Sequence, residues 1–286
     1  MVLSVRRLSE PLGAEITGID LRQPISDAIK AALQQALLDH HFIVVPGQAL
    51  NDLQHMRFCE VFGEIQSERT VPSLSSISTK WSTSDNQSEE VVGMMQVSNF
   101  VEDGILPNGE MWFHSDQCYF DTPCKCTSLH SIVAPKSGGH TRFSNCIKAY
   151  ETLPEETQRR LDGRTGMNIY DYHSENMCTL KTPHSPNAPR YSHPLARFHP
   201  ETGNRSLYLN RFMTDHVVDM DPDESRNLLD ELFDHMEQEE FIYEHPWKVG
   251  DLAIWDNRCL LHARTDFDPS EKRQLRRFAV VGERPI

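Results

Sequence analysis

The segment MWFHSDQCYF (residues 111–120) has the apolar character of a buried strand, yet it carries a histidine and an aspartate two residues apart. Successive side chains of an extended strand point to opposite faces, so His114 and Asp116 are expected to share one face. An unpaired charge facing an apolar interior is costly, and the pair therefore requires a cation or a hydrogen-bond network. Three interpretations are open from this segment alone: a metal site, a catalytic dyad, or a structural His–Asp hydrogen bond.

Further short strand signals accompany this segment along the chain. They lie in residues 91–100, 126–134, 140–145, 205–212, 240–247, 251–257 and 276–283. Helical patterns interrupt them in residues 26–41, 51–65, 147–163 and 221–238. Because strands and helices do not alternate regularly, the pattern favours an antiparallel sandwich or barrel over a doubly wound parallel sheet. We predict a mostly β fold with flanking helices around a double-stranded β-helix (jelly-roll) core.

The 286 residues show no internal repeat and no convincing linker, which predicts a single domain spanning 1–286. Two long polar stretches interrupt it. Residues 66–95 are rich in serine and threonine, and residues 172–194 are rich in proline. Loops of this length inside a compact domain are commonly functional, so both are predicted to be lids over a site. The alternative is that both are surface insertions.

Composition excludes several classes of function. The net charge is −14, with 42 acidic against 28 basic residues, whereas non-specific nucleic-acid binding needs a basic surface. No apolar run approaches the roughly 18 residues of a membrane span, and the first residues lack the apolar core of a signal peptide. The seven cysteines are scattered, which is typical of reduced thiols. We expect a cytoplasmic protein without nucleic-acid or membrane partners.

His262 is the candidate for the third ligand of a metal site. It ends the apolar segment GDLAIWDNRCLLH (residues 250–262). A strand there could return to the strand of His114 and Asp116. Two imidazoles and one carboxylate form the facial triad of non-haem Fe(II) oxygenases, which leaves three coordination positions open. The same donors can also hold the zinc ion of a hydrolase.

Basic residues follow this histidine in the segment EKRQLRRFAVV (residues 271–281). With a period of two, Arg273 and Arg277 share one strand face with an apolar row, while Arg276 points to the other face. A buried arginine needs an anion, and its planar fork matches a carboxylate. We therefore predict an anion site beside the metal site, with a salt-bridged surface strand end as the alternative for Arg273. We assign Arg276 to the surface or to a structural ion pair.

Together these pieces resemble the taurine dioxygenase/2,4-dichlorophenoxyacetate dioxygenase family of Fe(II)- and 2-oxoglutarate-dependent enzymes. The resemblance runs from about residue 12 to about residue 282 and includes LGAEITGIDL, VVPGQ, WFHSD, SGGHTRF, HPETG, GDLAIWDNRCLLH and RQLRRFAVV. It implies a jelly-roll enzyme that uses Fe(II), 2-oxoglutarate and O2. By residue, it implies that His114, Asp116 and His262 are the catalytic iron ligands.

The resemblance also assigns the co-substrate and substrate contacts. Thr141 and Arg273 match the residues that hold the distal carboxylate of 2-oxoglutarate, and Arg277 matches an arginine near both the co-substrate and the substrate anion. Glu110 and Gln117 flank the metal-binding motif and are candidate substrate contacts. A carboxylate at Glu110, where taurine-specific relatives have an asparagine, would repel a sulfonate, so taurine is not the expected substrate.

The implied reaction is hydroxylation of an unactivated C–H bond in a small acid-bearing molecule, with succinate and CO2 as co-products. Where the hydroxylated carbon bears a heteroatom, the product can collapse and the bond is cleaved. The family also suggests a homo-oligomer, either a dimer or a tetramer. A zinc hydrolase gives no role to Thr141, Arg273 and Arg277, and a non-catalytic 2-oxoglutarate sensor would not need every metal ligand retained; both remain alternatives.

Overall fold

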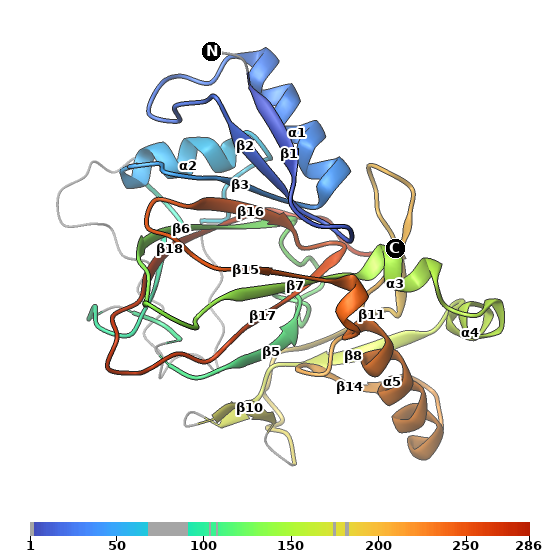
Figure 1. Ribbon diagram of the computed structural model, residues 1–286. Coiled ribbons are helices and arrows are strands. Elements are labelled where there is room, and N and C mark those ends of the chain that lie inside the picture. The colour runs from blue at the N-terminus through green and yellow to red at the C-terminus, as the bar shows by residue number, and fades with distance from the viewer. Residues whose placement is uncertain (1–2, 68–90, 103, 107, 174–175, 181–182) are drawn as a thin grey trace.

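The computed structural model describes residues 3–67, 91–102, 104–106, 108–173, 176–180 and 183–286. Within these residues, two β-sheets face each other and helices cover their outer faces (Figure 1). One sheet has the strand order β1 (Ser4–Arg7), β2 (Ala14–Thr17), β3 (Phe42–Val45), β16 (Leu252–Asp256), β6 (Cys126–Val133), β18 (Gln274–Val280), β4 (Met95–Ser98). The other has the order β15 (Ile242–His245), β7 (Thr141–Asn145), β17 (Leu260–Arg264), β5 (Met111–His114). This arrangement confirms the predicted mostly β jelly-roll fold with flanking helices.

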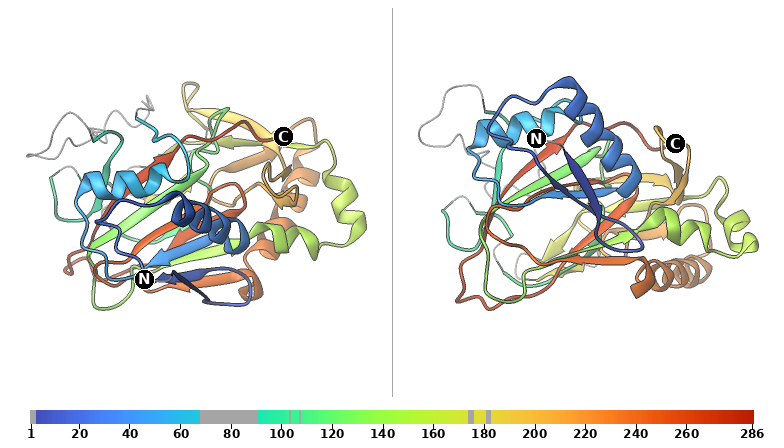
Figure 2. Two further views of the ribbon diagram at one scale, coloured as in Figure 1. Left: turned by 90° about the horizontal axis from the view of Figure 1, so that it is seen from above. Right: turned by 45° about the horizontal axis from the view of Figure 1, so that its top comes forward.

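The helices pack on opposite sides of this sandwich (Figures 1 and 2). On the seven-stranded sheet lie α1 (Asp27–His40) and α2 (Asp52–Glu60), and the second sheet is flanked by α3 (Cys146–Glu151) and α5 (Pro222–Met236). The region predicted as one helical stretch, 147–163, is split: α3 ends before Pro154, which occupies the N-cap of α4 (Glu155–Leu161). Proline lacks an N–H and cannot continue a helix.

A capping bond explains where α2 begins, but not where α1 begins. Asn51 and Gln54 form a reciprocal capping box at the start of α2, with both bonds 2.9 Å long. Ser26 occupies the N-cap of α1, as its sequence predicts, but its side chain makes no capping bond.

None of the helices in the described ranges combines the length and the apolar character of a membrane span.

Three apolar layers hold the sandwich together. One lies between the seven-stranded sheet and the helices α1 and α2, and one lies between the four-stranded sheet and α3 and α5. The third fills the space between the sheets and includes Phe42, Phe143 and Trp255. The strand β16 is buried along its whole length because it is covered on both faces, which explains its nearly continuous apolar sequence.

The remaining strands form smaller sheets at one end of the sandwich. A three-stranded sheet has the order β11 (Arg190–Pro194), β8 (Thr165–Ile169), β14 (Thr214–Val217). One two-stranded sheet pairs β9 (Tyr172–His173) with β10 (Asn176–Leu180), and another pairs β12 (Ala196–Phe198) with β13 (Arg205–Leu207). A short 3-10 helix, η2 (Glu239–Phe241), precedes β15. The predicted lid at 172–194 therefore contains β9, β10 and β11, and β10 lies beside β5. The other predicted lid, 66–95, falls mostly outside the described residues.

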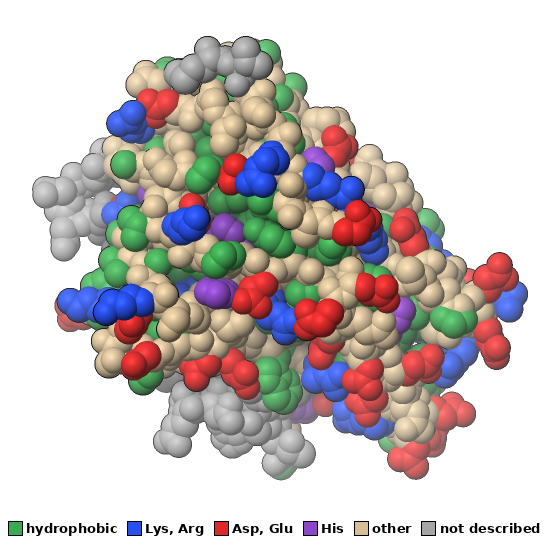
Figure 3. Space-filling view, viewed as in Figure 1, with side chains coloured by type: hydrophobic (Ala, Val, Ile, Leu, Met, Phe, Trp, Pro, Cys, Tyr) green, Lys and Arg blue, Asp and Glu red, His purple; other side chains and the backbone are tan. Residues whose placement is uncertain are grey.

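Charged side chains are interspersed on the face seen in Figure 3. Acidic side chains crowd at its lower right, over α4 and α5, in keeping with the net charge of −14. The described surface of this face has no broad basic area of the kind that nucleic-acid binding requires.

Candidate functional site

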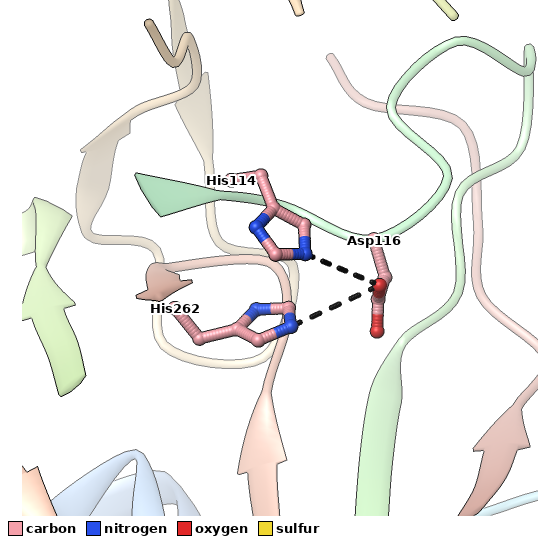
Figure 4. A group of neighbouring side chains, drawn as sticks. All are labelled: His114, Asp116 and His262. Atoms are coloured by element: carbon pink, nitrogen blue, oxygen red, sulfur yellow. Dashed lines mark ion pairs between the residues drawn. The ribbon is translucent and has the colours of Figure 1, made fainter. Parts of the chain in front are cut away.

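Two histidines and one aspartate from distant parts of the chain meet between the two sheets (Figure 4). The antiparallel register of β17 and β5 places His262 directly opposite His114, and their ring centroids are 4.1 Å apart. The Nε2 atoms of His114 and His262 each lie 3.9 Å from Oδ1 of Asp116. Two imidazole nitrogens and one carboxylate oxygen thus converge on a common point, which is a donor set that suits a first-row divalent metal ion.

The position of Asp116 differs from the expected one. Strand β5 ends at His114, so Asp116 lies in the following turn and not on the same strand face. The side chain of Asn257 holds this turn: its Oδ1 accepts from the Asp116 N–H at 2.8 Å, and its Nδ2 donates to the Asp116 carbonyl at 3.0 Å. Asn257 therefore replaces the ladder partners that a continued strand would have supplied, and it turns the carboxylate toward the imidazoles.

The Asp116 carboxylate is held as a charged group. Its Oδ2 accepts hydrogen bonds from Thr127 Oγ1 at 2.7 Å and from Arg277 Nη2 at 2.8 Å. Burial by itself raises the pKa of Asp116, but the charge and hydrogen bond of Arg277 outweigh burial and hold the pKa well below its ordinary value. The aspartate is therefore an anion at neutral pH, with Oδ1 turned to the histidines.

Both histidines are neutral at neutral pH, as metal ligation requires. Burial lowers the pKa of His114, and burial together with His114 lowers the pKa of His262 to about 3. The Nδ1 of His114 bonds to the carbonyl of Trp112 at 2.8 Å. Because a carbonyl can only accept, Nδ1 carries the proton and Nε2 presents its lone pair toward the aspartate.

A cavity of about 70 Å³ adjoins these three residues and has a cationic end. Arg273 lines it and is 3% exposed, and its guanidinium donates to the Gly139 carbonyl. Burial and the nearby Arg264 lower the pKa of Arg273 to about 9. Gly139 has a φ of 63°, and a Cβ there would lie 3.1 Å from the Arg273 Nε, so glycine allows this close approach.

Thr141 lines the same end of the cavity and has its hydroxyl oriented by a tryptophan. The indole N–H of Trp247 donates to Thr141 Oγ1 at 2.9 Å. One lone pair of the hydroxyl is therefore occupied, and its proton is available to donate. A hydroxyl donor and a buried guanidinium at one end of a small cavity form a site for a carboxylate.

The strand β18 separates its arginines as the period of two predicts. Arg277 lies in the cavity with Arg273, whereas Arg276 points to the helix side and pairs with Asp52 of α2 at 2.9 Å. Arg276 is therefore a structural ion pair. Although burial disfavours its charge, Asp116 raises the pKa of Arg277, so this arginine stays charged.

Sequence patterns did not predict a role for Arg264, which also lines the cavity. Its guanidinium donates to the carbonyls of Leu106, Asn108 and Gly109 at 2.6–2.9 Å. Leu106 has a φ of 53°, a left-handed conformation that is unfavourable for leucine. Arg264 thus stabilises a strained loop whose Leu106 side chain forms part of the cavity wall. The only sequence feature that could have pointed to Arg264 is its position two residues after the candidate metal ligand His262.

The two candidate substrate residues lie outside this cavity lining. Glu110 is exposed, and Gln117 is half-buried with a φ of 62°. The Gln117 Nε2 donates to Gln66 Oε1 at 2.8 Å. Arg264, by contrast, lines the cavity beside the trio of His114, Asp116 and His262.

Several aromatic side chains pack against one another beside His114, Asp116 and His262. The Phe212 ring contacts that of His114 edge-on, with centroids 5.3 Å apart, and the Tyr119 and Tyr170 ring centroids are 4.7 Å apart. Tyr119 and Phe212 belong to one apolar cluster with Met111 at the open side of β5. Of this cluster, Met111 lines the cavity, whereas Tyr119 and Phe212 are buried.

A second group of metal-binding residue types, His199, Asp256 and Cys259, is instead tied up in bonds within the protein. Arg258 binds both carboxylate oxygens of Asp256, at 2.8 and 2.6 Å, and His199 bonds to Oδ2 at 2.9 Å. With its acceptors satisfied, this group forms a buried structural network that shapes the turn between β16 and β17.

Comparison with known proteins identifies the chain. The profile of the family described as "Taurine catabolism dioxygenase TauD, TfdA family" matches residues 4–279. The chain belongs to this family. The protein is accordingly a 2-oxoglutarate-dependent oxidoreductase, with Fe(II) as its metal and 2-oxoglutarate and O2 as co-substrates. The predicted family and enzyme class are confirmed.

Individual members of the TauD/TfdA family are similar over nearly their whole length. An alpha-ketoglutarate-dependent 2,4-dichlorophenoxyacetate dioxygenase of Burkholderia sp. (strain RASC) is 30% identical, over 94% of this chain and 91% of its own. An alpha-ketoglutarate-dependent sulfate ester dioxygenase of Pseudomonas putida is 29% identical, over 99% of this chain and 91% of its own. The crystal structure of AAD-2 in complex with Mn(II) and N-oxalylglycine has a TM-score of 0.77 and 27% identity, and it covers 100% of this chain and 99% of its own.

Proposed function

We propose that the protein hydroxylates an unactivated C–H bond of a small acid-bearing molecule, with Fe(II) held by His114, Asp116 and His262. The observation that carries this proposal is the convergence of two neutral imidazoles and one carboxylate oxygen beside a cavity whose lining includes Arg273 and Arg277. When bound, the iron supplies the oxidising chemistry that couples decarboxylation of 2-oxoglutarate to hydroxylation, with succinate and CO2 released.

Arg273 and Thr141 are proposed to bind the distal carboxylate of 2-oxoglutarate. A desolvated guanidinium whose bonds to the protein go to the Gly139 carbonyl gains most from an anion. The Thr141 hydroxyl, oriented by Trp247, donates its proton to the same group. A hydrolase would not need this carboxylate site, so the cavity favours the dioxygenase over a zinc-dependent hydrolase.

Arg277 is proposed to serve both the metal site and the substrate. It holds Oδ2 of Asp116 through Nη2, while Nη1 faces the Met95 sulfur at 3.4 Å, a weak acceptor. The guanidinium therefore keeps donors for an acid group near the metal-binding trio. Such a contact would orient the C–H bond that is to be oxidised.

The apolar part of the cavity lining narrows the substrate class. Leu106, Met111 and Leu129 line the cavity together with its charged residues, so the substrate is proposed to combine an acid group with an apolar body. Taurine, which lacks such a body and would meet the carboxylate of Glu110, is not the proposed substrate. Where the oxidised carbon bears a heteroatom, hydroxylation would be followed by bond cleavage.

The remaining assignments follow the resemblance to the family. We propose one dioxygenase domain over residues 1–286, with residues 66–95 and 172–194 acting as lids that exclude water during turnover. Glu110 and Gln117 are proposed as outer substrate contacts, reached when a lid closes. A cytoplasmic homo-oligomer, either a dimer or a tetramer, is proposed for the assembled enzyme.

A substrate panel tests this function. Carboxylates, aryloxyacids, sulfonates, phosphonates and amino acids are incubated with the protein, Fe(II), 2-oxoglutarate and O2, and succinate is measured. We expect succinate release above background with at least one acid that carries an apolar body, and none without oxygen. Oxygen-independent turnover, or no succinate with any member of the panel, would contradict the proposal.

A further inference from the structure

The Asp116 carboxylate divides its two oxygens between different tasks. Oδ2 takes two donors, Thr127 Oγ1 and Arg277 Nη2, whereas Oδ1 is turned to the imidazole nitrogens, 3.9 Å from each. Asn257 fixes the main chain of Asp116 but does not bond to its carboxylate. The orientation of the carboxylate plane therefore depends on Thr127 and Arg277.

These two donors are anchored very differently. Thr127 is 0% exposed near the start of β6, opposite Trp255 on β16 and Ala279 on β18, so the sheet fixes the direction of its hydroxyl. Arg277 has a long side chain and is the residue proposed to contact a substrate anion. A short β-branched side chain in a sheet interior has one preferred rotamer, whereas an arginine has many.

The neighbours of Thr127 also orient its proton. The Arg277 Nη2 lies 3.5 Å from Thr127 Oγ1, and the Cys124 thiol lies 3.6 Å from it. Both groups can donate to the hydroxyl oxygen, and its single proton is then directed to Oδ2 of Asp116. The hydrogen bond of 2.7 Å has the length expected of a hydroxyl that donates to a carboxylate.

We propose that Thr127 is a positioning residue that fixes Asp116 as a one-oxygen metal ligand, and that it keeps the carboxylate in this orientation when Arg277 does not hold it. Arg277 can then turn to the acid group of a substrate without releasing the carboxylate. This inference rests on the proposed function, because it assumes that Asp116 binds the metal. Hydrogen-bonded partners of ligating carboxylates typically contribute 10- to 100-fold in metal affinity.

The test measures metal affinity by titration calorimetry with Mn(II), which is stable in air. Thr127→Val keeps the shape of the side chain and removes the hydroxyl, so we expect Mn(II) to bind about 10- to 100-fold more weakly. Thr127→Ser restores the hydroxyl and should bind within a few-fold of the wild type. Ser128→Ala is the matched control, because the Ser128 hydroxyl bonds to His55 and to the Ala253 carbonyl and does not contact Asp116.

Repeating the titration in an Arg277→Gln background separates a positioning role of Thr127 from a packing role. If Thr127 and Arg277 share Oδ2, then Thr127→Val lowers Mn(II) affinity by a larger factor in an Arg277→Gln background than in the wild type. Thr127→Ala replaces the valine variant if that variant does not fold, which the melting temperature of the metal-free protein shows. Wild-type affinity in both hydroxyl-free variants, or losses that simply multiply in the double variant, would overturn the role of Thr127. Failure of the wild type itself to bind Mn(II) would instead contradict the proposed function.

Discussion

At the scale of single residues, the site depends on which face of a strand an arginine occupies. Arg273 and Arg277 enter the cavity, while Arg276 pairs with Asp52 on the opposite face of the sheet. The sequence predicts this division from the period of two alone. It could not predict that Arg273 would donate to Gly139, because that contact depends on a glycine with a positive φ in another segment.

Arg273 and Arg276 therefore form a matched pair for testing co-substrate binding. Arg273→Met removes the cation proposed to face the distal carboxylate and should weaken 2-oxoglutarate binding by about 2–5 kcal/mol. Arg276→Met removes a cation of the same strand that faces α2 and should leave this affinity within a few-fold. The measurement is the KM for 2-oxoglutarate, compared with the KM for substrate. Equal effects of the two variants would contradict the assignment of Arg273.

At the scale of elements, strands carry His114, His262 and Arg277, but two short connections complete the site. The turn held by Asn257 presents Asp116, and the loop held by Arg264 presents Leu106. The segments that carry these groups were predictable, because apolar runs and the family motifs mark them. The hydrogen bonds by which Asn257 and Arg264 hold these segments were not predictable. They join side chains to backbone groups far away in the chain and leave no periodic signal.

Arg264→Lys tests whether the guanidinium holds the loop. Lysine keeps the charge, but its single ammonium cannot bind the carbonyls of Leu106, Asn108 and Gly109 in one fixed geometry. We expect faster amide hydrogen exchange in residues 104–110. We also expect about tenfold lower kcat/KM for substrate, with more succinate formed per molecule of product. Unchanged exchange in these residues would show that the loop does not depend on Arg264.

At the scale of the whole molecule, folding requires several buried histidines to be neutral. Burial lowers the pKa of both His41 and His193 to about 4, and burial lowers the pKa of His55 well below its ordinary value. These side chains lie on separate elements, with His41 at the end of α1, His55 in α2 and His193 in β11, so their effects on stability are expected to add. An unfolded chain takes up protons on all of them below about pH 6.5, whereas the folded chain does not.

The free energy of unfolding of the metal-free protein should therefore fall as pH decreases from about 6.5 to about 4. The unfolded state binds more protons in this window, and each histidine contributes about 1.4 kcal/mol per pH unit. Urea denaturation at several pH values measures this slope. His41→Asn should reduce this slope, because asparagine does not titrate in this pH window. Asparagine also tolerates the left-handed conformation of residue 41, where φ is 62°. A stability that stays constant or increases toward pH 5 would contradict this account.

The central claim is that His114, Asp116 and His262 hold Fe(II) in a way that lets 2-oxoglutarate bind to the same ion. Anaerobic addition of Fe(II) and 2-oxoglutarate tests it directly, because chelation of iron by the keto acid gives a weak visible charge-transfer band. We predict this band in the wild type and in Ser128→Ala, and its loss in Asp116→Ala. A wild type without the band, or an Asp116→Ala variant that keeps it at full strength, would contradict the claim.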